Sequence, residues 1–600
     1  MADACDFDYP WRPVYEWQMT VVWFGAAGLM LGVTGTLPVP TRLSAAATLF
    51  CLCAGGIRAI QAWRRSQDNS RIRLAERQFV QIGEMIRQAN EAARCDFLWM
   101  GRGFHWTDIE ASRMHALISR GIAAQMGKGL LHKEGAYWIH GIAREGDIHV
   151  DLGSLVGHTL IVGTTRVGKT RLLDLLIAQA IVRGEPVIII DPKGDHGLAG
   201  NARRICEAIG QGDRFIYFHP AHPDRSACID PLRNWNRKTE LASRIAALIP
   251  SETGGDPFTA FSWKVLNDIV NGLIASGIRP NLVQLRRYIE GGADELLLKA
   301  LRLHFRRHVQ DWESRISSFI KHSRGNQLLA YINFYKESVI HDAQSVDLEG
   351  LISTYEHNRE HFQKMVASLI PILSMLTSDP LTELLSPNLE PGHERVVTDM
   401  ARAIRSEKVL YVGLDSLADA TVGSAIGSVM LADLAAVAGD RYNYEIHSIK
   451  PVNLFIDEAA EVINQPTIQL MNKGGGALFR VTIATQTFAD FASRLGDENK
   501  ARQVLANTNN KIALRVLDAE TQQYIADGIP KIRAKTMMVR YGHNVDSGIH
   551  DEYTASYQEQ AVEEEVDLIP PALLSELPPL HFFARLSGGR TIKGRIPILR

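Results

Sequence analysis

The sequence has few cysteines and almost no net charge. Its six cysteines are spaced neither like metal ligands nor like a disulfide framework, which predicts a reducing compartment and no structural disulfide. The 65 lysines and arginines nearly balance the 67 aspartates and glutamates, so no overall electric field attracts nucleic acid. Any contact with DNA must therefore come from local patches or from the lining of a pore.

Histidines provide no clear metal site either. His219 and His222 in FHPAHPD could suggest zinc, but no further ligand cluster accompanies them, and packing within a loop is the favoured interpretation. At 600 residues the chain is too long for one hydrophobic core, and two to four domains are expected.

Two runs near the start of the chain lack charge, residues 19–37 and 43–57. They predict two membrane spans at about 19–37 and 43–63, the second reaching full length by including Arg58, which can snorkel from the helix end. A short turn joins them, and arginines follow directly at 64 and 65. This favours a hairpin with both chain ends in the cytoplasm and no cleaved signal peptide. A pair of buried core helices is the alternative.

A phosphate-binding loop is predicted after the apolar strand 159–162. The motif G-x-x-x-x-G-K-[ST] precedes a helical pattern, and its glycines allow backbone N–H groups to surround phosphates. The lysine would reach the outer phosphates and the last hydroxyl would ligate Mg²⁺. The predicted nucleotide-binding residues are Gly163, Thr164, Thr165, Arg166, Val167, Gly168, Lys169 and Thr170, although Arg166 could equally be a solvent-facing loop residue.

Two apolar strands end in acids and compete for the Walker B role. EPVIIIDPKGD ends in Asp191, whereas KPVNLFIDEAAEV ends in Asp457 and Glu458. The second is preferred because Asp457 can hold Mg²⁺ while Glu458 orients or deprotonates the attacking water. Asp191 is either a further nucleotide contact or a cap at the strand end.

Other polar residues at strand ends are weaker candidates. Gln486 follows the strand 480–485 and either senses the γ-phosphate or lies in a loop without nucleotide contact. Asn507 precedes the next predicted strand and Arg515 lies within it, and either could face the nucleotide of a neighbouring subunit.

The motifs GTTRVGKT, DPKGD, NLFIDEAAEV, NKGGGALF and IATQT, in this order and with a long insertion between the second and third, resemble the type IV coupling proteins of bacterial conjugation. The resemblance is greatest to the TraD proteins of integrating conjugative elements. It covers nearly the whole chain, because the two-span anchor, GRGFHW and ARLSGGRTIKGRIPIL also look like that group.

The resemblance implies an α/β fold, a RecA-like P-loop NTPase domain with an all-helical insertion and an N-terminal two-helix transmembrane anchor. It implies a homo-hexameric ATPase of the bacterial inner membrane that brings relaxase-bound single-stranded DNA to a type IV secretion channel. ATP and Mg²⁺ are the implied cofactors. Carried over residue by residue, the catalytic set is Lys169, Asp457, Glu458 and Gln486, and the metal ligands are Thr170 and Asp457.

The sequence departs from the family at a possible arginine finger. Some members carry an arginine where NKGGGALF has Gly474–Gly476, so Arg480 and Arg515 become the candidates here. The loop between the spans is also shorter than in many plasmid relatives.

The predicted domains are a membrane hairpin (1–65), a first part of the nucleotide-binding domain (66–279), a helical insertion (280–385) and a second part (386–600) with an acidic linker at Glu563–Glu565. Within the first part, AYWIHGI is predicted as a strand. The insertion is rich in arginine, with Tyr288, Phe305 and Trp312 among the arginines, which could bind a single strand or simply cover a core.

Two other functions stay open. One is a membrane receptor for protein substrates that uses ATP only to switch conformation, and the other is a chromosome translocase of the FtsK type. The two-span anchor and the helical insertion weigh against the latter.

Overall fold

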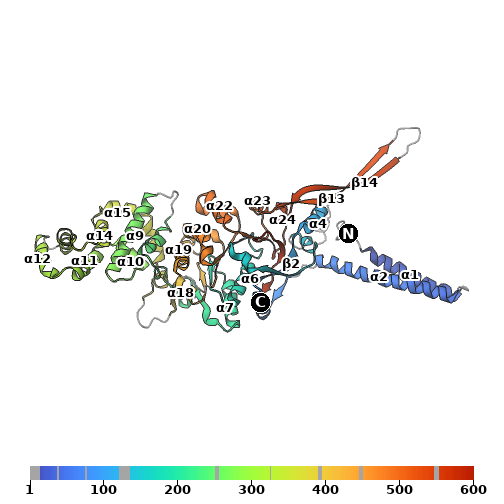
Figure 1. Cartoon of the computed structure of the whole chain (residues 1–600), viewed down its shortest axis with the longest axis horizontal. Coiled ribbons are helices and arrows are strands. Elements are labelled where there is room, and N and C mark those ends of the chain that lie inside the picture. The colour runs from blue at the N-terminus through green and yellow to red at the C-terminus, as the bar shows by residue number, and fades with distance from the viewer. Residues whose placement is uncertain are drawn as a thin grey trace.

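The computed structural model describes residues 14–36, 40–73, 77–119, 135–249, 256–323, 326–388, 395–444, 450–545 and 553–600. The molecule is elongated, with a central sheet domain, a helical region at one end and a helical hairpin at the other (Figure 1).

An 11-stranded sheet forms the centre of the fold, in the order β3-β2-β16-β15-β12-β4-β11-β10-β5-β9-β6. From β12 to β6 neighbouring strands are parallel, whereas β15, β16, β2 and β3 extend the sheet in antiparallel fashion. The strand bounds are β2 Phe97–His105, β3 Gly146–Asp151, β4 Thr159–Val162, β5 Val187–Asp191, β6 Phe215–Phe218, β9 Val409–Gly413, β10 Val452–Ile456, β11 Phe479–Thr485, β12 Asn510–Ala513, β15 His581–Arg585 and β16 Thr591–Arg595.

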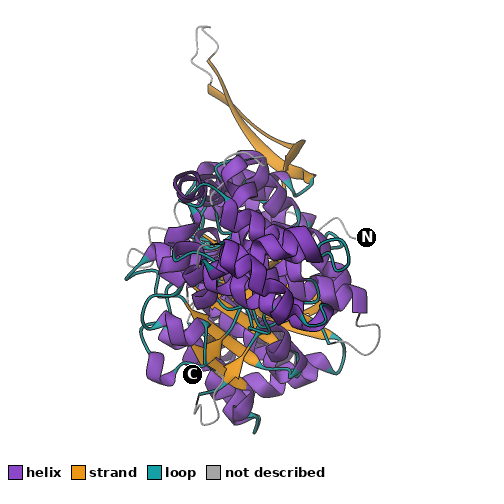
Figure 2. Cartoon of the chain, turned by 90° about the vertical axis from the view of Figure 1, so that its left-hand side faces the viewer, coloured by secondary structure: helices purple, strands orange, loops and turns teal. Residues whose placement is uncertain are grey.

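The parallel strands are buried on both faces, which explains their unbroken apolar sequences. In β5, Val187 and Ile189 join the core under α3 Ile82–Ala93, α6 Lys169–Val182 and α7 His196–Ala208. Ile188 and Ile190 point to the opposite core, under α18 Met400–Arg405, α19 Ala420–Tyr444, α20 Gln465–Lys473 and α22 Glu498–Ala506. Helices therefore cover both sides of the strands (Figure 2).

Short elements complete the sheet domain. They are β1 Phe79–Val80, α4 Asp108–Ser119, η1 Tyr137–Gly141, η2 Leu152–Val156, η3 Gly212–Arg214, η4 Pro223–Arg225, β7 Cys228–Ile229, β8 Val397–Thr398, η6 Ala459–Glu461, η7 Gly474–Ala477, α21 Phe488–Leu495, α23 Ala519–Asp527, α24 Pro571–Ser575 and β17 Ile598–Leu599. The predicted strand AYWIHGI is wrong, because this segment is the 3₁₀-helix η1. Its Trp138, Ile139 and His140 are all buried, so an apolar run here fills a turn rather than a strand.

The helical region begins earlier in the chain than predicted, at α8 Lys238–Ala246 and α9 Pro257–Ala275 instead of residue 280. Helix α9 packs on α8, α10, α11 and α14, so it belongs to the helical group. The others are α10 Leu282–Glu290, α11 Asp294–His308, α12 Trp312–His322, α13 Gln327–Phe334, the π-helix η5 Tyr335–Val339, α14 Val346–Glu356, α15 Arg359–Met365, α16 Leu369–Leu376 and α17 Leu381–Leu385. They form the end opposite the hairpin (Figure 1).

The predicted acidic linker is also wrong. Glu563–Glu565 belong to β14 Tyr553–Asp567, which pairs along its whole length with β13 Lys531–Val545. Lys531 stands opposite Asp567 and Arg533 opposite Glu565, so opposite charges across the ladder favour a strand where charge alone suggested a tether. This two-stranded ribbon projects from the body (Figures 1 and 2).

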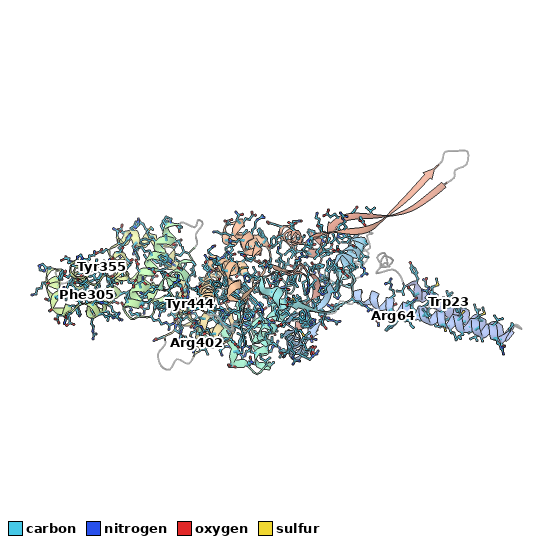
Figure 3. All side chains as sticks on the ribbon, in the orientation of Figure 1. Trp23, Arg64, Phe305, Tyr355, Arg402 and Tyr444 are labelled. Atoms are coloured by element: carbon cyan, nitrogen blue, oxygen red, sulfur yellow. The ribbon has the colours of Figure 1, made fainter. Side chains whose placement is uncertain are left out.

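At the other end, α1 Tyr15–Thr36 and α2 Thr41–Arg73 pack against each other. Among the residues that the structure describes, two helices are long and apolar enough to cross a membrane, α2 over Thr41–Gln67 and α19. Helix α19 lies mostly inside the protein, whereas only 22% of the apolar stretch in α2 is buried. Large apolar side chains of the hairpin are exposed, among them Val21, Leu29, Leu31, Leu49, Phe50 and Trp63, as the stretch between Trp23 and Arg64 in Figure 3 illustrates.

Candidate functional site

A tight loop joins β4 to α6 and creates the central feature of the site. The loop turns at Gly168, which adopts φ +113° immediately before the first residue of α6. At Gly163, an added Cβ would lie 2.9 Å from Leu514 Cβ, so a larger residue would push the loop away from its neighbour. Thr164 N–H donates to the Arg515 carbonyl at 2.9 Å, which fixes the loop against the end of β12.

Lys169 begins α6 and points back across this loop. Its side chain is only 6% exposed, and its Nζ donates to the Gly163 carbonyl at 2.7 Å and lies 3.5 Å from Glu458 Oε1. Burial lowers the pKa of Lys169, while the nearby acids oppose that shift. A buried ammonium held over a loop of backbone donors is a site for a polyanion.

Two acids meet this lysine at the end of β10. Asp457 Oδ2 accepts a hydrogen bond from the Thr170 hydroxyl at 3.4 Å, and burial raises the pKa of Asp457 to about 6. Glu458 lies in the left-handed backbone region at φ +41°, an unfavourable conformation that concentrates at functional sites. Burial alone would raise the pKa of Glu458, but Lys169 and other donors hold it below its usual value.

One member of this cluster, Lys193, was not predicted from the sequence. Its Nζ forms an ion pair with Glu458 Oε1, and Gln486 Nε2 donates to the same oxygen at 3.2 Å. Gln486 therefore reaches the cluster, through Glu458. Lys193 follows the end of β5 within DPKGD, and only the adjacency of β5 and β10 brings it to Glu458. The polar turn after a buried parallel strand was the available signal.

Asp191 does not line the site, contrary to the prediction that it binds nucleotide. It is completely buried, and its carboxylate accepts from Lys193 N–H at 3.0 Å, Asp195 N–H at 2.6 Å and the Tyr411 hydroxyl at 2.7 Å. The carboxylate thus shapes the turn that presents Lys193. This is the capping role, the alternative considered from sequence.

A cavity of about 570 Å³ opens beside the cluster. Of the predicted nucleotide-binding residues, Thr164, Thr165, Arg166, Gly168, Lys169 and Thr170 line it, together with Lys193 and Glu458. Val167 is buried beneath the loop and packs into the core. The rest of the lining comes from two other parts of the chain, Arg77, Gln78 and Tyr137 before the loop and residues 579–581, 595, 596 and 598 near the end of the sequence.

The two arginine-finger candidates both form polar contacts within the chain. Arg480 lies at the start of β11, at the end of the sheet away from the loop, and pairs with the buried Glu185 at 3.2 Å. Arg515 Nε donates to the Leu577 carbonyl at 2.6 Å. Asn507 caps α22 and contacts Asn472.

Within the described ranges, no group of His, Cys, Asp or Glu side chains forms a metal-binding cluster. His219 accepts a hydrogen bond from Ala221 N–H and packs against Gly194 and Gly413.

The aromatic residues of the helical region are mostly core residues. Tyr288 and Phe305 are buried, and Trp312 packs against Phe305 and Tyr331. The buried rings of Tyr288 and Phe305 offer no open stacking face to bases, and Trp312 is only partly exposed. The arginines at 302, 306 and 307 are exposed on α11.

Comparison with known families identifies two segments. Residues 145–336 match the type IV secretion-system coupling protein DNA-binding domain, and residues 451–579 match the TraM recognition site of TraD and TraG. The first includes the phosphate-binding loop and most of the helical region; the second includes Asp457, Glu458 and the β13–β14 ribbon. No curated protein matches the sequence.

A solved structure shares the fold. The bacterial conjugative coupling protein TrwBdeltaN70, in its unbound monoclinic form, aligns with a TM-score of 0.50 over 76% of this chain and 88% of that chain at 15% identity. The plasmid coupling protein TrwB in complex with ADP and Mg²⁺ aligns with a TM-score of 0.49 over 75% of this chain and 87% of that chain, also at 15% identity.

Proposed function

The chain belongs to the TraD/TraG family of type IV coupling proteins, and from this premise we propose that it is a membrane-anchored ATPase that drives single-stranded DNA into a secretion channel during conjugation. The observation that carries the proposal is the convergence of Lys169, Asp457 and Glu458 at the carboxyl ends of adjacent parallel strands, beside a cavity large enough for a nucleotide.

The residues present fit ATP and Mg²⁺. Loop N–H groups and Lys169 would hold the phosphates, and Thr170 with Asp457 would hold a metal ion, which would supply positive charge against the phosphates. The raised pKa of Asp457 supports this assignment, because a carboxylate that is only 5% exposed gains most from a nearby cation. Glu458 and Gln486 orient the attacking water, and Glu458 accepts its proton.

Single-stranded DNA is the molecule that we propose this ATPase moves. The exposed arginines of α11 provide local positive charge in a chain whose overall charge is near zero. Their contact with DNA is through phosphates, since Tyr288 and Phe305 are buried and Trp312 is only partly exposed. A relaxase bound to the strand, the components of the secretion channel and a homo-hexameric assembly complete the proposed partners.

The hairpin α1–α2 is the proposed anchor in the bacterial inner membrane. Its exposed apolar side chains would be costly in water and are favourable in lipid, while Arg64 at the body end of α2 suits the cytoplasmic surface. Both termini and the sheet domain then lie in the cytoplasm.

ATP hydrolysis by the full chain in detergent, with and without single-stranded DNA, tests the proposal. We expect single strands to increase turnover several-fold, and Lys169→Ala and Glu458→Gln to abolish it. Lys408→Ala, at the amino end of β9 and far from the loop, is the matched control and should retain full turnover. Hydrolysis that ignores DNA would instead favour the receptor for protein substrates.

A further inference from the structure

The cavity beside the phosphate-binding loop has a second wall that phosphates alone do not need. Beside the loop, the lining includes the partly exposed side chains of Leu580 and Ile598, together with Arg77 and Tyr137. Such a combination of apolar surface with a few polar groups is typical of a site for the organic part of a ligand.

This wall is held at a fixed distance from the loop. Leu580 N–H donates to the Val167 carbonyl at 2.8 Å, and the Leu580 carbonyl accepts from Ile596 N–H at 2.8 Å. Leu580 adopts φ +66°, and its side chain lies where a Cβ on Gly168 would reach it at 2.8 Å. The loop and the wall therefore form one rigid cleft.

The same wall is joined to the segment that leaves the membrane hairpin. Strands β1 and β17 are parallel neighbours; Ile598 N–H donates to the Gln78 carbonyl at 2.7 Å and Arg600 N–H to the Val80 carbonyl at 2.9 Å. The Arg600 guanidinium lies 3.6 Å from the centre of the Phe79 ring, which adds a cation–π contact to the pairing.

A second connection leads from the hairpin to the cavity. Helix α2 contacts η1, whose first residue, Tyr137, lines the cavity. In Figure 1, α2 leaves the body close to β2, and β2 is followed in the sheet by β16 and β15. Arg77 follows the last residue of α2 by only four positions.

We propose that this wall is the subsite for the nucleoside end of the bound nucleotide: Leu580 and Ile598 contact the base, and Arg77 contacts the base or ribose. The proposal rests on the proposed ATPase function and adds that the segment leaving the membrane hairpin is part of the nucleotide site. A planar guanidinium stacks on aromatic faces and donates in a fixed fork, which suits a nucleoside. A residue only four positions beyond the hairpin is thereby placed in contact with the nucleotide.

Calorimetric titration of the full chain in detergent with two probes, ATP and inorganic tripolyphosphate, tests the subsite. Both probes carry the phosphates, but only ATP carries the nucleoside. Arg77→Ala and Ile598→Ala should weaken ATP binding about tenfold and leave tripolyphosphate binding unchanged. Arg87→Ala, on the exposed surface of nearby α3 and outside the cavity, should change neither.

Equal losses for ATP and tripolyphosphate, or no loss for either, would overturn the subsite. Lys169→Ala distinguishes a failure of the subsite from a failure of the ATPase proposal, because it should weaken the binding of both ATP and tripolyphosphate. If Lys169→Ala changes neither, the nucleotide site itself is misplaced and the proposed function fails with it.

Discussion

The substitution Glu458→Gln separates catalysis from binding at this site. It keeps the volume of the side chain and removes a negative charge that two lysines share. Lys169 Nζ lies 3.5 Å from Glu458 Oε1, and Lys193 is paired with the same oxygen. The side chains of Lys169 and Glu458 are 6% and 9% exposed, so solvent screens their attraction only weakly.

Two opposite effects follow. Loss of a general base slows turnover by about 10²- to 10⁴-fold, equivalent to about 3–5 kcal/mol in the barrier. Binding should tighten, because the lysines no longer have an internal anion and are free for the phosphates. A hydrogen bond to a charged group contributes about 1.5–3 kcal/mol. The side chain of Lys193 is 41% exposed, so solvent weakens its attraction to Glu458 and mainly Lys169 counts. We therefore expect Glu458→Gln to bind ATP about tenfold more tightly.

Titration with a fluorescent ATP analogue measures the affinity, and phosphate release in a single turnover measures the chemical step. Lys169→Ala is the control and should lose both binding and turnover. The reasoning is refuted if Glu458→Gln binds ATP more weakly than the natural chain, or if its turnover stays within tenfold.

Three further changes test the roles assigned elsewhere. Arg480→Ala leaves the buried Glu185 with fewer partners and should lower the free energy of unfolding by about 2 kcal/mol without changing hydrolysis per folded molecule, as measured by thermal melting and ATPase assay. Tyr411→Phe removes a hydrogen-bond donor from Asp191; burial raises the pKa of Asp191, and the Tyr411 hydroxyl limits that rise. Because Asp191 is protonated more readily in the folded state, its contribution to stability falls as pH rises. The variant should therefore lose about 1–2 kcal/mol of unfolding free energy at neutral pH but little at acidic pH, where Asp191 is protonated. Leu52→Arg places a charge on the exposed face of α2 at a cost of about 2.5–3.5 kcal/mol and should reduce the fraction of the chain that resists alkaline extraction from membranes.

Each of these changes has a result that would contradict it. Lost hydrolysis in fully folded Arg480→Ala would restore Arg480 as a finger acting on a neighbouring subunit. An equal loss of stability for Tyr411→Phe at neutral and acidic pH would mean that the charge of Asp191 is not involved. Leu417→Arg, on an exposed loop of the body, is the control for Leu52→Arg; an equal effect of both would remove the anchor as the cause.

Local sequence was sufficient for the parts of the site that lie within one short segment. The loop from Gly163 to Thr170 depends on glycine conformations and on the strand and helix beside it, all encoded within about twenty residues. The two consecutive acids Asp457 and Glu458 after an apolar strand could be predicted for the same reason. The uncharged runs of the hairpin likewise reflect a requirement of each helix by itself.

Only the tertiary structure decided which distant residues meet. Lys193 reaches Glu458 because β5 lies beside β10, although 265 positions separate the two residues. Asp191 is buried and holds the turn after β5 through hydrogen bonds, one of them from the Tyr411 hydroxyl on β9. That contact depends on β9 lying beside β5 in the sheet and not on the sequence motif itself. Arg77 and Ile598, from opposite ends of the chain, share one cavity wall because β1 pairs with β17. Periodicity and motifs describe neighbours along the chain, whereas strand pairing and burial set neighbours in space.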